Sequence, residues 1–492
     1  MSPGLVFAVI AGYFLLLITI SYFTSRNANS ETFFTGNRQS PWYLVAFGMI
    51  GATLSGVTFI SVPGEVGSSQ FSYFQIVLGY IPGYAFIALV LMPLYYKLNL
   101  VSIYGYLEKR FGFYAYKTGA FFFLLSRLIG ASARLFLVAG VLHLAFFKAF
   151  GVPFWLTVLI AIALIWLYTF RGGIKTIVWT DTLQTLFMLS AVVISISLIG
   201  SELNLSPGEL VTTVRESDLS KTFFWDWQSG ENFFKQFLSG AFIAIVMTGL
   251  DQDMMQKNLT IKTLKDAQKN MLGFTVVLVI ANILFLSLGA LLYIYANQTG
   301  IEIPAKSDDL FPTLAVNHFN IFAGIVFLLG ITAAAYSSAD SALTALTTSF
   351  CVDILGIGRD RDEVRDAAKE KIDKQIRMRV HLMFSALLLI VIMVFEWLNN
   401  DSVIVAVFKI AGYTYGPLLG LYAFGLYTKW KVKDHLIPWI AVLSPVVSFI
   451  LDINSEAWFN GFKFGFFILI VNGAITFLGL FLARDRAAEP DA

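Results

Sequence analysis

A cluster of oxygen-bearing side chains interrupts a long apolar stretch in the second half of the chain. The sequence AAAYSSADSALTALTTSF, residues 333–350, contains Ser337, Ser338, Asp340, Ser341 and Thr344. Hydroxyl and carboxylate oxygens are the ligands that hard cations prefer. Serine and threonine in a membrane helix also bond back to the carbonyl oxygen four residues earlier, or allow close helix packing. The stretch therefore indicates either a cation site or a packing surface on one helix.

Four further charged side chains lie within apolar stretches. They are Asp181 in VWTDTLQ, Lys409 in VFKIAGYTYGP, and Arg127 and Arg134 in FLLSRLIGASARLFL. A charge at the bilayer centre costs about 2.5–3.5 kcal/mol on insertion scales, so each of these side chains needs a partner. Arg127 and Arg134 share one helix face because of their spacing. Arg127 lies in the first half of its helix, where its side chain would extend to the cytoplasmic membrane interface. The deeper Arg134 suits a ligand carboxylate or an ion pair with Asp181 or Asp340, and the residues alone leave both roles open.

The composition places these residues in a membrane protein. The chain has 492 residues, of which 57% are hydrophobic and 13% charged, and its mean hydropathy is +0.73. A soluble protein carries about 25% charged residues. The net charge of +2 and the lack of a basic tract argue against nucleic-acid binding. The single cysteine, Cys351, excludes an intramolecular disulfide, and neither a metal-ligand spacing nor an enzyme motif is present, so we expect no enzyme.

Apolar segments of spanning length recur along the whole chain. A helix needs about 20 apolar residues to cross the hydrocarbon core. The first such segment, Gly4–Phe23, lacks the basic flank of a signal peptide. We expect an all-α integral membrane protein with about 13 transmembrane helices. The expected spans lie near residues 4–23, 42–66, 73–98, 114–148, 152–170, 176–200, 233–256, 271–297, 317–351, 378–398, 402–427, 434–452 and 461–484.

Basic residues concentrate in alternate loops. By the positive-inside rule this bias predicts an outside N-terminus and a cytoplasmic C-terminus, which fits an odd number of spans. The short tail and the lack of targeting elements favour a bacterial cytoplasmic membrane. The loops that carry the bias contain Arg26, Arg38, Lys97, Lys109, Arg110, Lys117, Arg171, Lys175, Lys257, Lys262, Lys265, Lys269, the segment 359–379, Lys429, Lys431, Lys433, Arg484 and Arg486.

The second expected span carries the signs of a broken helix. Its sequence FGMIGATLSGVTFISVPGEVG contains five glycines, small hydroxyl residues and Pro63. Irregular backbone at membrane depth persists only where protein or water satisfies its polar groups. Such breaks form substrate and ion sites in transporters, because the freed carbonyl groups coordinate cations.

Four motifs spread along the chain resemble those of the sodium/solute symporter family. They are RGGIKTIVWTDTLQ (171–184), DQDMMQK (251–257), AAAYSSADS (333–341) and GYTYGPLLGLYAFGL (412–426). The resemblance implies the inverted-repeat fold of the leucine transporter, with a core of five plus five helices. Residues 1–41 would then hold an extra helix and a cytoplasmic loop, and 42–200 the first repeat. An extracellular loop at 201–232 would precede the second repeat at 233–427, and 428–492 would hold two final helices and the tail.

The resemblance also implies a sodium ion as the coupling ion and a ligand set for it. The ligands would be the hydroxyl groups of Ser337 and Ser338 and the carbonyl groups of Gly51, Leu54 and Ala334. Family members often carry alanine at position 51, a change that a carbonyl ligand tolerates.

A second cation site at the carboxylates is a further possibility. Asp181, Ser337, Asp340 and Ser341 match positions that bind a second sodium in some members. An ion pair between Asp340 and Lys409 would instead satisfy both charges without sodium, and a contact of Asp340 with the substrate or a bound proton is also open.

The resemblance predicts a sodium-coupled symporter that imports a small organic solute by alternating access. Arg134 tilts the expectation toward an anionic solute such as a monocarboxylate, an amino acid or sialic acid. A sodium-coupled sugar or polyol carrier and a proton-coupled carrier using Asp340 or Asp181 are the alternatives. Besides substrate, sodium and the lipid bilayer we expect no nucleic acid and no obligate protein partner. The candidate substrate ligands are Ser55, Thr58, Tyr73, Phe74, Gln75, Arg134, Tyr413 and Tyr415.

Overall fold

The protein is described by a computed structural model over residues 3–25, 38–169, 173–357, 367–398 and 403–485. Across these ranges the chain is helical, and its one β-bridge joins Val432 to Arg484. The helices of the first half are α1 (Pro3–Ser25), α3 (Trp42–Thr53), α4 (Gly56–Ser69), α5 (Tyr73–Phe86), α6 (Met92–Lys97), α7 (Gly105–Arg110), α8 (Phe113–Ala145), α9 (Phe154–Thr169), α10 (Gly173–Glu202) and α11 (Pro207–Glu216). Those of the second half are α12 (Phe233–Ala244), α13 (Gln252–Leu259), α14 (Leu264–Thr299), α15 (Leu310–Thr313), α16 (Ile321–Ser349), α17 (Ala367–Leu398), α18 (Val403–Thr414), α19 (Gly416–Tyr427), α20 (Ile437–Ile453), α21 (Ser455–Trp458) and α22 (Ile468–Leu482).

The helices account for the expected spans. Within the described ranges, nine helices are long and apolar enough to cross a membrane, and three more spans arise if each bent helix pair counts as one. The apolar segment Phe154–Leu167 of α9 is shorter. Each expected span coincides with a long helix, a bent pair or this shorter segment, so the prediction of an all-helical membrane fold is confirmed.

The second expected span is broken near its middle, as its glycines predicted. α3 and α4 meet at an angle of 53°. Between them Leu54 has a ψ of 68° and Ser55 a ψ of −179°, so neither continues the helix. Two other spans bend similarly, by 63° before α13 and by 46° between α18 and α19.

Side chains satisfy the freed carbonyl groups at two of these breaks. Tyr95 and Tyr104 donate to the carbonyl oxygens of Gly249 and Leu250, shortly before α13, at 2.8 and 3.0 Å. Asn472 of α22 donates to two carbonyl oxygens of α18, at 3.0 and 2.9 Å. At the α3–α4 break, no hydrogen bond from the described residues reaches the carbonyl oxygens of Gly51 and Leu54. These two carbonyl groups therefore need another partner.

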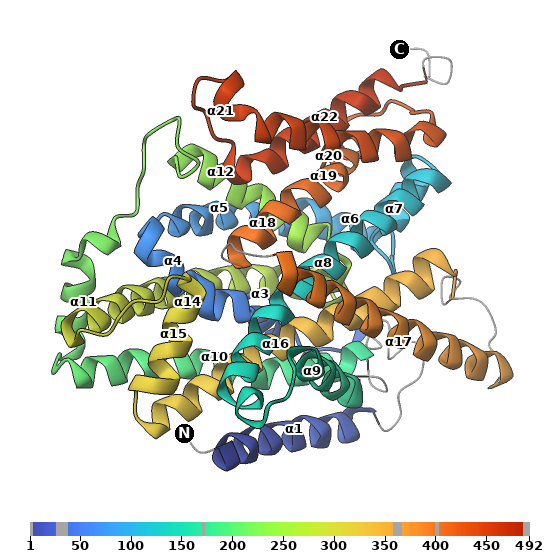
Figure 1. Ribbon diagram of the computed structural model, residues 1–492. Helices are drawn as coiled ribbons and strands as arrows, with labels where there is room; N and C mark the ends of the chain where they lie inside the picture. The colour runs from blue at the N-terminus through green and yellow to red at the C-terminus, as the bar shows by residue number, and fades with distance from the viewer. Residues whose placement is uncertain (1–2, 26–37, 170–172, 358–366, 399–402, 486–492) are drawn as a thin grey trace.

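The broken helix α3 lies at the centre of the bundle. It packs against α10, α14 and α16, while α1 lies at one edge of the molecule and α20 to α22 at the opposite edge (Figure 1). α5 and α12 also approach closely, because a methyl group on Gly79 or Gly240 would lie about 2 Å from a backbone oxygen of the other helix. Small residues permit such close contact between membrane helices.

The polar segment 201–232 is partly helical, although the sequence predicted a loop. It contains α11, whose first turn is held by a capping box between Ser206 and Glu209. Gln75 of α5 donates to the carbonyl oxygen of Glu231 at 2.9 Å and accepts from the backbone of Phe224 at 3.2 Å. Gln75, a candidate substrate ligand, thus anchors this segment to α5.

Candidate ion and substrate sites

The hydroxyl pair of α16 faces the free end of α3. Ser337 and Ser338 are fully buried. A methyl group on Gly51 would lie 3.2 Å from Ser337 Oγ, which places the end of α3 directly beside this hydroxyl. Two free carbonyl groups and two hydroxyl groups are a donor set that suits a hard monovalent cation. The structure thus places Gly51 of α3 beside Ser337 of α16, and the chemistry of these donors suits sodium.

Asp181 of α10 lies on the other side of Ser337. Its Oδ1 accepts from Ser337 Oγ at 2.8 Å, and its Oδ2 accepts from Ser341 Oγ at 3.4 Å. One turn further along α10, Thr185 Oγ1 accepts from the backbone N–H of Gly51 at 2.9 Å and donates to the Asp181 carbonyl oxygen at 2.8 Å. The turn of α10 that carries Asp181 therefore holds both α3 and α16.

Lys257 provides the cation at Asp181. Its Nζ lies 2.6 Å from Asp181 Oδ2, and its side chain is 2% exposed. The sequence placed Lys257 among the basic residues of a cytoplasmic loop, which is wrong. The bend before α13 carries it into the protein, because Asp251 caps α13 through Oδ1 and the helix then packs inward.

The expected ion pair between Asp340 and Lys409 is not formed. Asp340 is completely buried on α16, whereas the side chain of Lys409 is exposed on α18. Asp340 Oδ1 accepts the backbone N–H of Ser341 at 2.5 Å. The two residues face different environments, so this alternative is wrong, and the carboxylate that pairs with a lysine is Asp181.

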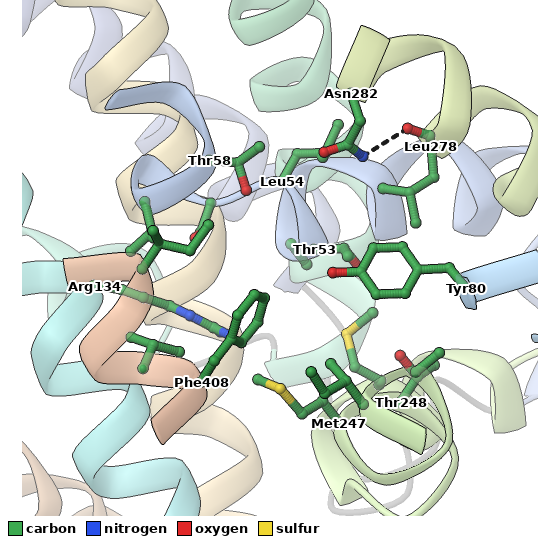
Figure 2. Close-up of a pocket in the computed structure, with 18 of the residues that line it drawn as sticks. Thr53, Leu54, Thr58, Tyr80, Arg134, Met247, Thr248, Leu278, Asn282 and Phe408 are labelled. Carbon is green, nitrogen blue, oxygen red and sulfur yellow. Dashed lines mark hydrogen bonds between the residues drawn. The ribbon is translucent and has the colours of Figure 1, made fainter. Parts of the chain in front are cut away.

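A central cavity opens beside the α3–α4 break. Ser55, Thr58, Tyr73 and Arg134, four of the candidate substrate ligands, line it. Figure 2 shows Arg134 and Phe408 on one side of this space, with Tyr80, Met247 and Thr248 on the other. The described residues of its walls include two arginines, Arg127 and Arg134, and no carboxylate. Because Arg127 forms an ion pair with Asp253, Arg134 supplies the positive charge of this largely apolar cavity.

Two polar groups of the cavity were missed by sequence reasoning. Asn282 of α14 donates to the Leu278 carbonyl oxygen at 2.8 Å (Figure 2). Its Oδ1 and the hydroxyl of Thr53 have no hydrogen-bond partner among the described residues. A buried amide or hydroxyl without a partner is costly, so these atoms are candidates to bind polar groups of a solute. An asparagine inside a long apolar helix was the available signal.

A stacked aromatic pair bounds the cavity on the side of residues 201–232. The rings of Tyr73 and Phe408 lie nearly parallel with centroids 6.2 Å apart. Both rings, together with Ile404, also line a second cavity, whose walls include Gly230 and Glu231. Because the same side chains contribute to both spaces, they form the boundary between them.

Arg127 belongs to a buried charged network on the opposite side. It forms an ion pair with Asp253 and lies 4.0 Å from Asp251. Tyr415, at the bend between α18 and α19, donates to Asp251 Oδ2 at 2.5 Å. Sequence reasoning assigned Arg127 to a membrane interface and missed both aspartates. The network joins α8 to two of the three helix breaks.

The remaining candidate substrate ligands lie away from the central cavity. Tyr413 donates to Asp452 of α20 at 2.6 Å, and Tyr415 belongs to the charged network. Phe74 is half-buried against the core, and Gln75 anchors segment 201–232. Arg171, in the first of the four motifs, lies outside the described residues.

The bent spans around a central site define a transporter of the leucine-transporter type. A solved structure of a Na⁺-coupled sialic acid symporter, in a substrate-bound outward-open state, has the same fold with a TM-score of 0.79 at 22% identity, covering 97% of each chain. Mhp1, a nucleobase-cation-symport-1 family transporter in a closed conformation, has a TM-score of 0.57 at 14% identity, covering 92% of this chain and 94% of Mhp1.

The sequence profile of the Sodium:solute symporter family matches residues 33–434, so the chain belongs to this family. It is a Na⁺-coupled transporter and not an enzyme. The sodium/sialic acid symporter SiaT of Proteus mirabilis is 26% identical over 86% of this chain and 84% of its own. Sodium-coupled monocarboxylate transporter 2 of Mus musculus is 23% identical over 86% of this chain and 69% of its own.

Proposed function

We propose that this symporter imports a small organic anion, a carboxylate, together with sodium. The observation that carries the proposal is Arg134, whose guanidinium faces a central cavity without a carboxylate in its walls. Among the described residues Arg134 has no ion-pair partner, and its side chain donates one hydrogen bond, to the hydroxyl group of Ser338. A guanidinium in that position binds a carboxylate through two parallel hydrogen bonds.

The relatives support this chemistry. Those named above carry sialic acid and monocarboxylates, and the sodium/iodide cotransporter of Homo sapiens, 24% identical over 81% of this chain and 61% of its own, carries another anion. Asn282 and Thr53 would bind further polar groups of the solute. Ser55, Thr58 and Tyr73 would complete the contacts from the α3–α4 break and α5.

The sodium ion would bind between the carbonyl groups of Gly51, Leu54 and Ala334 and the hydroxyl groups of Ser337 and Ser338. The free carbonyl groups at the break support this set. Binding of sodium there would favour the state open to the side of residues 201–232, which we assign as extracellular. That orientation puts the N-terminus outside and the C-terminus in the cytoplasm of a bacterial cell. We keep the division into repeats at 42–200 and 233–427, and we propose no obligate protein partner.

Thermal stability of the purified protein tests the sodium site without a substrate. We expect Na⁺ to raise the melting temperature above that in K⁺ or choline, since a ligand of the folded state stabilises it by mass action. The Ser337→Ala/Ser338→Ala variant should lose this difference. Equal stability in Na⁺ and K⁺ would contradict the site and direct the same assay, across pH, to Asp340→Asn and Asp181→Asn.

Uptake into proteoliposomes tests the substrate class. Under an inward Na⁺ gradient, we expect accumulation of labelled sialic acid or a monocarboxylate and none of a neutral hexose or polyol. Arg134→Gln should lower accumulation about 10- to 100-fold, whereas Thr157→Ala, a buried residue away from the cavity, serves as the matched control. Accumulation of the hexose with no anion transported would make the protein a sugar or polyol symporter.

A further inference from the structure

The carboxylate of Asp181 is already neutralised by a cation that belongs to the chain. Lys257 Nζ lies 2.6 Å from Asp181 Oδ2, at the distance of a charge-assisted hydrogen bond. Both side chains are almost completely removed from solvent, and Lys257 is among the largest fully buried side chains of the protein. A buried carboxylate needs such compensation.

The oxygen atoms around the ammonium resemble a ligand set for a second cation. Ser337 and Ser341 place their hydroxyl groups on the two oxygens of Asp181, at 2.8 and 3.4 Å. Together they offer a carboxylate and two hydroxyl groups, which suits a hard monovalent ion. An ammonium carries the same charge as Na⁺ and donates to the same oxygens. A sodium ion entering here would meet an ion pair and the repulsion of a positive charge.

We propose that Lys257 is a tethered cation that takes the place of a second sodium at Asp181. The protein would then bind one sodium per chain, at the set that includes Ser338, and this inference rests on the sodium site proposed above. Removal of the ammonium would convert Asp181, Ser337 and Ser341 into a second sodium site. Lys257 would thus determine how many sodium ions are carried with each solute molecule.

The position of Lys257 links its ion pair with Asp181 to the position of α13. The residue lies on α13, directly after the 63° bend, whereas Asp181 lies on α10 and its hydroxyl partners on α16. A free ion leaves its site by diffusion, but a tethered one leaves only when α13 moves relative to α10. The charge at Asp181 therefore follows the conformation of the half-helix and not the external sodium concentration.

Equilibrium binding of ²²Na⁺ to the purified, full-length protein tests the proposal. We expect about one Na⁺ per chain for the wild type and about two for Lys257→Met, whose side chain has a similar length but no charge. The double variant Lys257→Met/Asp181→Asn has a neutral pair and should return to about one. Gel filtration of each variant checks folding.

Two results would overturn the proposal that Lys257 replaces a sodium ion. The first is that the wild-type protein binds two Na⁺. The second is that Lys257→Met folds and still binds only one. If Lys257→Met does not fold, one Na⁺ in both the wild type and the neutral double variant supports the proposal. A wild type that binds no Na⁺ would remove the proposed sodium site itself, and with it the proposal, so that failure is distinguishable from a wrong stoichiometry.

Discussion

Arg134 donates a hydrogen bond from Nη1 to Ser338 Oγ across 3.3 Å. The cation that faces the central cavity therefore contacts one of the hydroxyl groups that we assign to sodium. In this arrangement the guanidinium opposes sodium in two ways, since it uses the hydroxyl and adds a positive charge. An anionic solute bound to Arg134 would neutralise that charge and draw the guanidinium toward the cavity. Solute and sodium would then favour each other's binding, and the coupling free energy is the same in both directions.

This relationship predicts opposite effects of Arg134→Gln on the two ligands. Uptake of the anion should fall about 10- to 100-fold, because a hydrogen bond to a charged group contributes about 1.5–3 kcal/mol. Sodium affinity in the absence of solute should rise, since the positive charge beside Ser338 is gone. Na⁺ titrations of the melting temperature measure the second effect.

Arg134→Lys is the matched control for charge. It keeps the positive charge, so its solute-free sodium affinity should stay near that of the wild type while anion uptake falls. If Arg134→Gln binds sodium no more tightly than Arg134→Lys, the guanidinium does not oppose sodium and the coupling must arise elsewhere.

The sequence predicted those features of the proposed sodium site that have a strong local signal. Glycines in an apolar span indicated the break at Leu54, and the adjacent hydroxyl groups of Ser337 and Ser338 indicated the partner helix. Both signals depend only on residues close in sequence, because a helix break and a helix face are local properties. The structure brings the two segments together, as the resemblance implied.

The sequence could not predict which charges pair. Asp181 and Lys257 are separated by 76 residues along the chain, and their contact depends on the bend before α13. Asp251, Asp253 and Lys257 look like the polar end of a span, because charges that follow a helix break have the composition of a loop. Asn282 gave a local signal, but its role depends on which face of α14 borders the cavity.

Removing either ring of the Tyr73–Phe408 pair should make the central cavity more accessible to thiol reagents. In a Cys351→Ser background with Thr58→Cys as reporter, we expect Tyr73→Ala or Phe408→Ala to speed labelling by a membrane-impermeant thiol reagent. The increase should be about 2- to 10-fold, since a stacked aromatic pair contributes about 0.5–1.5 kcal/mol to a closed arrangement. Tyr73→Phe keeps the ring and loses only its 3.2 Å hydrogen bond to Tyr80, so it should label like the parent. Unchanged labelling in both alanine variants would mean that these rings do not form the boundary.

The charged network at Arg127 should behave as a buried ion pair. Arg127→Met or Asp253→Leu alone should each destabilise the protein by about 3–5 kcal/mol, because the remaining charge is left buried without its partner. The double variant should be much less unstable than the sum of the two, and denaturant titration in mixed micelles measures all three. The exposed pair of Lys463 and Glu456 is the control, where Lys463→Met should cost about 0–1 kcal/mol. Additive effects at Arg127 and Asp253 would show that the two charges do not stabilise one another.

Position 51 leaves room only for glycine in this chain, although the family resemblance led us to expect that alanine would be tolerated there. A methyl group on Gly51 would lie 2.3 Å from Thr185 Oγ1, and the helix backbone fixes that methyl group in place. Thr185 cannot simply rotate away, because its hydroxyl bonds to both the Gly51 N–H and the Asp181 carbonyl oxygen. Gly51→Ala should therefore destabilise the protein by about 1–3 kcal/mol, as overpacking does, and weaken the stabilisation by Na⁺.

A double-mutant cycle separates this steric conflict from a general effect of alanine. Thr185→Ala removes the obstructing oxygen, so Gly51→Ala should cost less in that background, with a coupling of about 0.5–3 kcal/mol. Gly130→Ala in α8 is the control, since its methyl group would meet no atom within 4 Å, and the higher helix propensity of alanine should leave stability unchanged or increase it. If Gly51→Ala destabilises the protein equally in the wild-type and Thr185→Ala backgrounds, the Thr185 hydroxyl is not what excludes a side chain at position 51. If the double variant regains the stabilisation by Na⁺, the clash with the Thr185 hydroxyl is what displaces the Gly51 carbonyl group in Gly51→Ala.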